Sequence, residues 1–193
     1  MDNLLSDINV LDLSQGVSGP FCAKLLAGWG ADVIKIEPPG TGDSCRSAKP
    51  LFQSNDLSEA SALFSYINTS KKSVTLDPSI SSHAEAIIKL AQNCDVLIES
   101  FPAGYLATCG LSFGDIFDSC PGLVYVSVTP FGQTGPYSTY KGSDLIAQAA
   151  GALMNTIGLP DRPPLKVGGE AALYTTGISA FSATTMAIYV KDL

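Results

Sequence analysis

The chain has 193 residues, of which 46% are hydrophobic, and a net charge of −7. This length and composition predict one globular domain with a sizeable core and exclude a disordered chain. The acidic balance argues against nucleic acid as a partner, and the longest apolar segment, residues 178–190, is too short and too polar to span a bilayer, so that no membrane partner is expected.

The first forty residues alternate a strand, a helix and a second strand. Residues 8–13 are apolar at every second position, which predicts a strand, and a polar, glycine-containing loop follows at 14–19. Pro20 suits the first turn of a helix whose apolar residues recur on one face as far as Trp29. Residues 31–37 then predict a second strand, and a strand–helix–strand unit of this kind is expected to be right-handed and parallel.

The rest of the chain continues this alternation after a loop rich in Pro and Gly at 38–43 and a segment at 44–55 that we expect to be irregular. The predicted strands are 73–76, 95–99 and 123–129, and the predicted helices are 58–67, 82–93, 115–119, 139–151 (a loop leading into a helix) and 178–190. Repeated units predict an α/β fold with a Rossmann-like, doubly wound, mostly parallel sheet and helices on both faces.

Four loops leave the carboxyl ends of predicted strands, where sheets of this kind bind ligands. They span residues 14–19, 37–43, 100–104 and 130–137. Their Gly, Pro and Ser residues are also ordinary turn residues, so each loop alone indicates no more than a turn. Their shared position after strands is what makes them a candidate site.

The chain carries a series of motifs that resembles the class III CoA-transferase family. The motifs are GPF at 19–21, LAGWGADVIKIE at 26–37, GTGDSCR at 40–46, NTSKKSVTLD at 68–77, DVLIESF at 95–101, VSVTPFGQTGP at 126–136 and DLIAQ at 144–148. The resemblance covers nearly the whole chain, in order. It implies a Rossmann-like large domain that binds coenzyme A, with an acyl-CoA and a small carboxylic acid as substrates and no metal.

The family's small domain has no counterpart in this chain. Members are about twice as long, leave the large domain to build a small one, and interlock as dimers. The resemblance therefore implies that residues 1–193 are the N-terminal, CoA-binding part of the large domain. The chain is accordingly read as a fragment, a split gene product or one part of a fused protein, and as a member of a homo- or hetero-oligomer.

The resemblance also implies which residues contact coenzyme A. Arg46 and Lys141 are further candidates for binding the phosphates of coenzyme A. The alternative for both is that they are charged surface residues without a ligand. Without the resemblance, Lys71 reads as a solvated turn residue and Phe101 as a core aromatic. The residues assigned to coenzyme A are Gln15, Gly16, Val17, Ser18, Ile67, Asn68, Lys71, Ser100, Phe101 and Lys141.

Position 173 departs from the family pattern at the catalytic residue. The family's Ala-Asp-Tyr-x-x-Gly becomes Ala-Leu-Tyr-x-x-Gly, with Leu173 where the nucleophilic Asp stands. In the family that carboxylate attacks the acyl thioester, which an aliphatic side chain cannot do. Glu170 is the nearest acid and a weak candidate to replace the missing nucleophile. The alternative is that Glu170 is a solvated loop residue with no catalytic role. His83, the only histidine, lies in the predicted helix 82–93, away from these loops, and gives the racemase reading little support.

Three hypotheses follow. The chain is a CoA-transferase half whose catalytic acid is supplied elsewhere, an active enzyme that uses Glu170 or acts like a racemase, or a non-catalytic CoA-binding scaffold. Its five cysteines are scattered, odd in number and without metal-ligand spacing. We expect them to be reduced thiols of a cytoplasmic protein, and the acidic N-terminus does not resemble a secretion signal.

Overall fold

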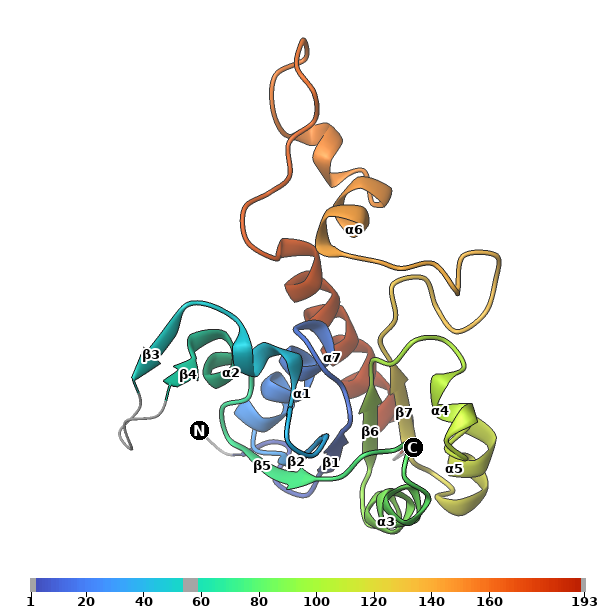
Figure 1. The fold of residues 1–193 in the computed structure, drawn as a ribbon. Helices are drawn as coiled ribbons and strands as arrows, with labels where there is room; N and C mark the ends of the chain where they lie inside the picture. Colours follow the sequence, from blue (N-terminus) through green and yellow to red (C-terminus); the bar gives the residue numbers. More distant parts are fainter. Residues whose placement is uncertain (1–2, 54–58, 192–193) are drawn as a thin grey trace.

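The computed structural model describes residues 3–53 and 59–191 (Figure 1). Its centre is a sheet of five parallel strands in the order β5-β2-β1-β6-β7. The strands are β1 (Asn9–Asp12), β2 (Asp32–Glu37), β5 (Lys71–Thr75), β6 (Val96–Glu99) and β7 (Val124–Ser127). This order confirms the predicted doubly wound, parallel sheet.

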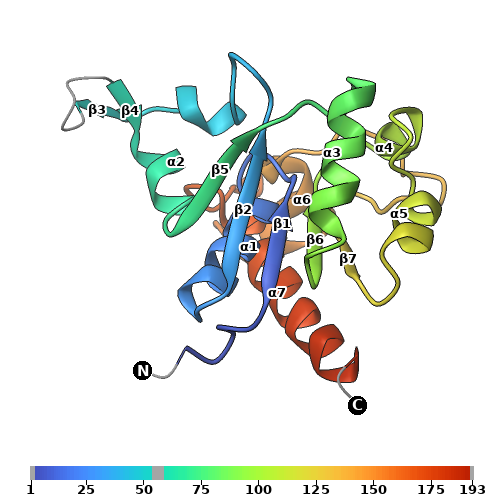
Figure 2. The same ribbon diagram turned by 90° about the horizontal axis from the view of Figure 1, so that it is seen from below.

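Helices cover both faces of this sheet, as the views in Figures 1 and 2 show together. Consecutive residues of β1 illustrate the division: Val10 and Leu11 are both fully buried but belong to different core clusters, because neighbouring side chains of a strand point to opposite faces. One face carries α1 (Ser18–Gly28) and α7 (Ala171–Lys191), and the other carries α3 (Ser81–Ala91), α4 (Tyr105–Thr108) and α5 (Phe113–Ser119).

The helices α1 and α7 pack closely because Gly177 has no side chain. A Cβ at this position would lie 2.8 Å from the carbonyl oxygen of Ser18 and 3.0 Å from the ring of Phe21. The helix α7 starts at Ala171, so the predicted start at 178 was wrong. Leu173 consequently lies in the first turn of a helix that faces the sheet.

The segment between β2 and β5 corrects two further predictions. It forms a short 3-10 helix, η1 (Ser44–Ser47), and an antiparallel pair of strands, β3 (Leu51–Gln53) and β4 (Glu59–Ser61), where an irregular segment was expected. The helix α2 (Ala62–Ile67) begins later than the predicted 58, because Ser61 Oγ caps it by accepting a hydrogen bond from Phe64 N at 3.2 Å. Residues 54–58 lie outside the described residues.

The last insertion before α7 contains α6 (Asp144–Ala150) and a second 3-10 helix, η2 (Leu153–Thr156). This segment extends away from the sheet in Figure 1. Within residues 3–53 and 59–191, no helix combines the length and the apolar character that crossing a bilayer requires.

Candidate functional site

The strand order reverses between β1 and β6, because the chain adds β2 on one side of β1 and β6 on the other. Open α/β sheets bind ligands at the carboxyl ends of the strands that flank such a point. A cavity of about 300 Å³ lies there. Its lining comes from residues 15–18 after β1, Ser100 after β6, residues 128–130 after β7, Gly142, Ser143 and Ala147 at α6, and Leu173 and Thr176 of α7.

The cavity brings together six of the residues singled out in the sequence. They come from three distant segments: Gln15, Gly16, Val17 and Ser18, then Ser100, then Leu173. Three of the four predicted loops thus meet at this switch-point cavity. The fourth, residues 37–43, lies outside its lining and takes part in a buried network of charges instead.

The other residues assigned to coenzyme A do not line the cavity. Ile67 is fully buried and packs in a cluster with Val17. Phe101 stacks on Tyr105 with 5.1 Å between ring centroids, within the core cluster on the α3 side of the sheet. Lys141 is exposed and, among the described residues, has no ion-pair partner.

The loop after β1 is fixed by partners far away in the sequence. Ser100 Oγ accepts a hydrogen bond from Gln15 N at 2.8 Å and donates to Gln15 O at 3.1 Å. Gly16 N donates to Asp43 Oδ1 at 3.3 Å, and Gly16 has a φ of +75°, a conformation that favours glycine. The wall of the cavity is therefore positioned by the protein itself.

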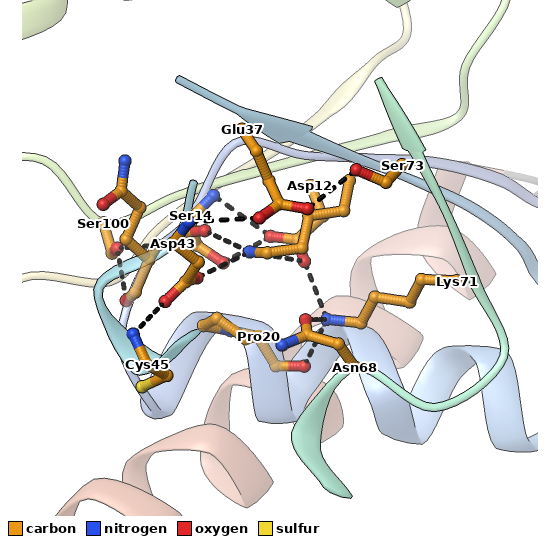
Figure 3. Close-up of polar contacts among 12 residues, drawn as sticks. Asp12, Ser14, Pro20, Glu37, Asp43, Cys45, Asn68, Lys71, Ser73 and Ser100 are labelled. Atoms are coloured by element: carbon orange, nitrogen blue, oxygen red, sulfur yellow. Dashed lines mark hydrogen bonds and ion pairs between the residues drawn. The ribbon is translucent and has the colours of Figure 1, made fainter. Parts of the chain in front are cut away.

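Charged side chains beneath this loop form a buried network, part of which Figure 3 shows. Lys35, 1% exposed, donates to Ser14 O at 2.8 Å and pairs with Asp43 at 2.9 Å and with Asp12 at 3.8 Å. Burial alone would raise the pKa of Asp12, but Lys35 and Lys71 outweigh it and hold that pKa below its usual value. Burial lowers the pKa of Lys35, but Asp12 and Asp43 outweigh it and raise that pKa. Asp12 and Lys35 therefore favour their charged forms.

Lys71, which the resemblance assigned to coenzyme A, belongs to this network. Its ammonium donates three hydrogen bonds of 2.8 Å each, to Asp12 Oδ2, Pro20 O and Asn68 Oδ1 (Figure 3). An ammonium has three protons, so all of them are used inside the protein. The side chain of Lys71 is 2% exposed, and burial lowers its pKa. Lys71 therefore joins β5 to Asp12 of β1 and to Pro20 of α1.

Arg46, the other candidate for a phosphate, is bound to Glu37. Its Nε and Nη2 donate to the carboxylate at 2.6 and 2.8 Å, and its guanidinium lies 3.9 Å from the ring centroid of Phe64. Ser73 Oγ donates to the same carboxylate at 2.7 Å. Burial would raise the pKa of Glu37, but the hydrogen bonds from Arg46 and Ser73 lower it to about 2.

None of the acid–base groups considered for chemistry lines the cavity. Leu173 does, but every other lining side chain is also without an ionisable group. Glu170 directly precedes α7, and its carbonyl oxygen accepts a hydrogen bond from Tyr174 N at 3.1 Å. His83 lies in α3, on the opposite face of the sheet, where its Nδ1 accepts a hydrogen bond from Asp77 N at 3.1 Å.

Sequence reasoning missed a second group of residues around the cavity. Asp144 fixes the first turn of α7, because its Oδ1 accepts a hydrogen bond from Ala172 N at 2.9 Å and its Oδ2 pairs with Lys166 at 2.7 Å. Thr129 and Thr176 line the cavity itself. In the sequence, Thr129 stands at the end of a predicted strand and within the motif at 126–136, but neither signal assigned it a role, and Thr176 precedes the predicted start of its helix.

The fold defines an α/β protein with a cavity at its switch point. Among the described residues, no three His, Cys, Asp or Glu side chains are grouped to hold a metal ion. Comparison with protein families matches residues 5–192 to CoA-transferase family III. The chain therefore belongs to CoA-transferase family III, as the sequence motifs predicted.

Its relatives share this family and extend beyond the match. The chain is 37% identical over all of its length to a formyl-CoA:oxalate CoA-transferase of Streptomyces avermitilis, and covers 46% of that protein. It is 38% identical, over 91% of its length, to a succinyl-CoA:mesaconate CoA-transferase of Haloarcula hispanica, of which it also covers 46%. The crystal structure of a CAIB/BAIF family protein from Brucella suis matches 97% of the chain with a TM-score of 0.92 and 34% identity, and the match covers 50% of that chain. The chain thus spans about half the length of the relatives it matches.

Proposed function

We propose that residues 1–193 form the N-terminal, coenzyme A-binding part of a class III CoA-transferase, and that they supply no nucleophile for the transfer. One observation carries this proposal: a cavity at the switch point gathers residues 15–18, Ser100 and Leu173, and none of the described residues in its lining has an ionisable side chain. By analogy with the named relatives, the substrates are an acyl-CoA and a small carboxylic acid.

The size of the cavity supports a site for one end of the cofactor. At about 300 Å³ it is at the lower limit of small-molecule sites, too small for the whole of coenzyme A. We assign it to the thiol and acyl end, with the nucleotide outside. Exposed Lys141 is the cation best placed for a phosphate, since Lys71 and Arg46 are already bound to carboxylates.

The absence of a carboxylate in the lining supports the second half of the proposal. Transfer needs a group that attacks the acyl carbonyl and displaces the CoA thiolate, leaving an acyl–carboxyl anhydride. Leu173 has no lone pair to offer. Glu170 and His83 are not favoured as substitutes, because Glu170 does not line the cavity and His83 lies on the other face of the sheet.

A partner chain is part of the proposal, as in the interlocked dimers that the resemblance implies. Four large apolar side chains of α7 are more than half exposed, and an exposed apolar surface of this kind marks an interaction site. They are Ile178, Met186, Tyr189 and Val190. Light scattering should therefore report an oligomer, homomeric or with a different chain. The five cysteines are all unpaired, which supports our proposal of a cytoplasmic location.

Titration calorimetry with coenzyme A tests the binding proposal, and the Leu173→Asp variant tests the missing nucleophile. We expect the unmodified protein to bind coenzyme A without transferring it from acetyl-CoA to small acids. Leu173→Asp should yield an acylated or CoA-linked carboxylate that hydroxylamine cleaves, as seen by intact mass, while the matched Leu173→Asn variant should not.

Transfer by the unmodified protein, with no other chain present, would overturn the proposal. Glu170→Gln then decides the alternative: abolished transfer would establish Glu170 as the displaced nucleophile. If the protein binds coenzyme A but neither variant at position 173 gains a trapped intermediate, the scaffold hypothesis is the remaining one.

A further inference from the structure

The loops after β6 and β7, which both form walls of the switch-point cavity, are joined by the side chain of Gln133. Its Nε2 donates a hydrogen bond to Glu99 Oε1 at 3.1 Å and another to Ser127 Oγ at 2.9 Å. Its Oε1 accepts a hydrogen bond from Gly104 N at 3.1 Å. Both protons and the oxygen of this amide are therefore engaged, and two of the three bonds cross from the loop after β7 to β6 and the loop that follows it.

A side chain makes this connection because the backbone ladder between the two strands ends earlier. The last bond of the ladder runs from Val128 N to Glu99 O at 2.9 Å. Among the described residues, no backbone hydrogen bond joins the rest of the loop after β7, residues 129–137, to the loop after β6. Residues 129–130, which line the cavity, therefore lie between the end of the ladder and the contacts of Gln133.

Glu99 is connected to the cavity through the residue that follows it. Glu99 is 0% exposed, and its Oε2 accepts a hydrogen bond from Phe101 N at 2.8 Å. Glu99 lines a separate cavity of about 140 Å³ beside α4, whereas Ser100 lines the switch-point cavity, so these neighbours face different sides of the chain. Ser100 in turn holds Gln15 in the loop after β1. The three loops that line the cavity are thus joined in series, with Gln133 at one end.

We infer that Gln133 and Glu99 are positioning residues of the switch-point cavity: their hydrogen bond fixes the loops after β6 and β7 relative to each other, and the affinity for coenzyme A depends on it. Neither side chain lines this cavity, so both act through residues that do. The two residues belong to the motifs at 95–101 and 126–136, in which they had no assigned role. The inference rests on the proposed function for the identity of the ligand, but not for the link between the loops.

The variant Gln133→Glu tests the link, because it places a carboxylate of the same shape as the amide opposite Glu99. Two carboxylates in contact repel each other, so in titration calorimetry at pH 8 the variant should bind coenzyme A about tenfold more weakly than the unmodified protein. At pH 6 the two groups should share a proton, since burial already raises the pKa of Glu99, and the difference from the unmodified protein should shrink. Tyr125, which also faces Glu99, keeps its proton at both pH values because burial raises its pKa.

The double variant Glu99→Gln/Gln133→Glu again sets an amide opposite a carboxylate, with the two groups exchanged. It should recover the affinity at pH 8, which a simple loss of packing at either position would not allow. The matched control is Gln92→Glu, because Gln92 is exposed at the end of α3 and undergoes the same change of charge. This control should bind coenzyme A as the unmodified protein does.

Amide hydrogen exchange tests the same link without a ligand. If Gln133→Glu separates the loops, exchange should become faster at Gly104 N and also at Gln15 N, which depends on Ser100. Unchanged exchange at both amides overturns the inference, as does an affinity that falls equally at pH 8 and pH 6 and is not recovered in the double variant. If the unmodified protein binds no coenzyme A, the proposed function is overturned, while exchange at these two amides still decides whether Gln133 positions the loops.

Discussion

Replacing Lys35 by Met should destabilise the protein more than any exposed ion pair could. Lys35 and Asp43 are 1% and 0% exposed and 2.9 Å apart. Removing one member of a buried pair costs about 3–5 kcal/mol, because the other charge is left without a partner. Asp12 keeps its 2.8 Å pair with Lys71, so Asp43 is the one charge stranded, and Ser14 O loses its donor. We therefore expect the free energy of unfolding to fall by about 4 kcal/mol.

Urea unfolding at pH 7 measures this loss, with Lys72→Met as the matched control. Lys72 pairs with Asp32 at 2.7 Å, but 68% of its side chain is exposed, so its removal should cost less than about 1 kcal/mol. The double variant Lys35→Met/Asp43→Asn no longer strands a charge and should recover about half of the loss. Equal effects of Lys35→Met and Lys72→Met, or a double variant no more stable than Lys35→Met, would refute the assignment of a charged, buried network.

Two further predictions concern the Glu37 pair and the contact of α1 with α7. The pKa of Glu37 is lowered to about 2, so its pair with Arg46 stabilises the fold above the ordinary value of 4.5 and loses that effect as the pH falls towards 2. The Arg46 side chain is about half exposed, so Arg46→Met should lower the free energy of unfolding by about 1–2 kcal/mol at pH 7 and by almost nothing at pH 2. Urea unfolding measures both values, and equal losses at the two pH values would contradict this prediction. Gly177→Ala should lower the free energy of unfolding by about 1–3 kcal/mol, because its Cβ would collide with the carbonyl oxygen of Ser18. The control is Gly28→Ala, which should not destabilise the protein because nothing lies within 4 Å of the added Cβ. Similar thermal midpoints for the two variants would refute the close packing of α1 and α7.

The sheet was predictable because its signal is local. The apolar pattern of residues 8–13 predicts a strand, and the structure buries neighbouring Val10 and Leu11 in different clusters, one on each face of the sheet. Parallel pairing of the two strands follows from the helix between them. The position of the cavity at the carboxyl ends of the strands follows from the same topology.

The start of α7 was not predictable from periodicity. Thr175, Thr176 and Gly177 favour helices weakly, so the pattern becomes clear only at 178. The turn at Ala171 is instead fixed from outside by Asp144, 28 residues earlier in the chain, which accepts a hydrogen bond from Ala172 N. The β3–β4 pair could not be predicted for the same reason. It is formed by hydrogen bonds between the two strands, and neither strand has a sequence pattern of its own that indicates it.

The partners of charged residues were equally hidden. Lys71 reads as a solvated turn residue or as a ligand contact, yet it is buried against Asp12, 59 residues away. Nothing in the sequence distinguishes a lysine that meets solvent from one whose acceptors arrive through the fold. Residues 15–18 and Ser100 line the cavity because they follow the ends of strands, whose position the topology determines. Lys71 and Asn68 were assigned without such a constraint, and they do not line it.

The division between charged and uncharged regions links the stability of this chain to its proposed function. Asp12, Lys35, Asp43 and Lys71 neutralise one another beneath the loop after β1, and that loop forms the wall of a cavity without charge. A carboxylate at position 173 would enter this neutral cavity with no neighbouring cation to lower its reactivity or to anchor a competing acid. An unpaired carboxylate is a better nucleophile than a paired one, while desolvation without a cation raises the pKa of a carboxyl group, so the two effects oppose each other at this position. Position 173 would thus hold an unpaired carboxylate, which is the reason to expect that Leu173→Asp alone creates a reactive group.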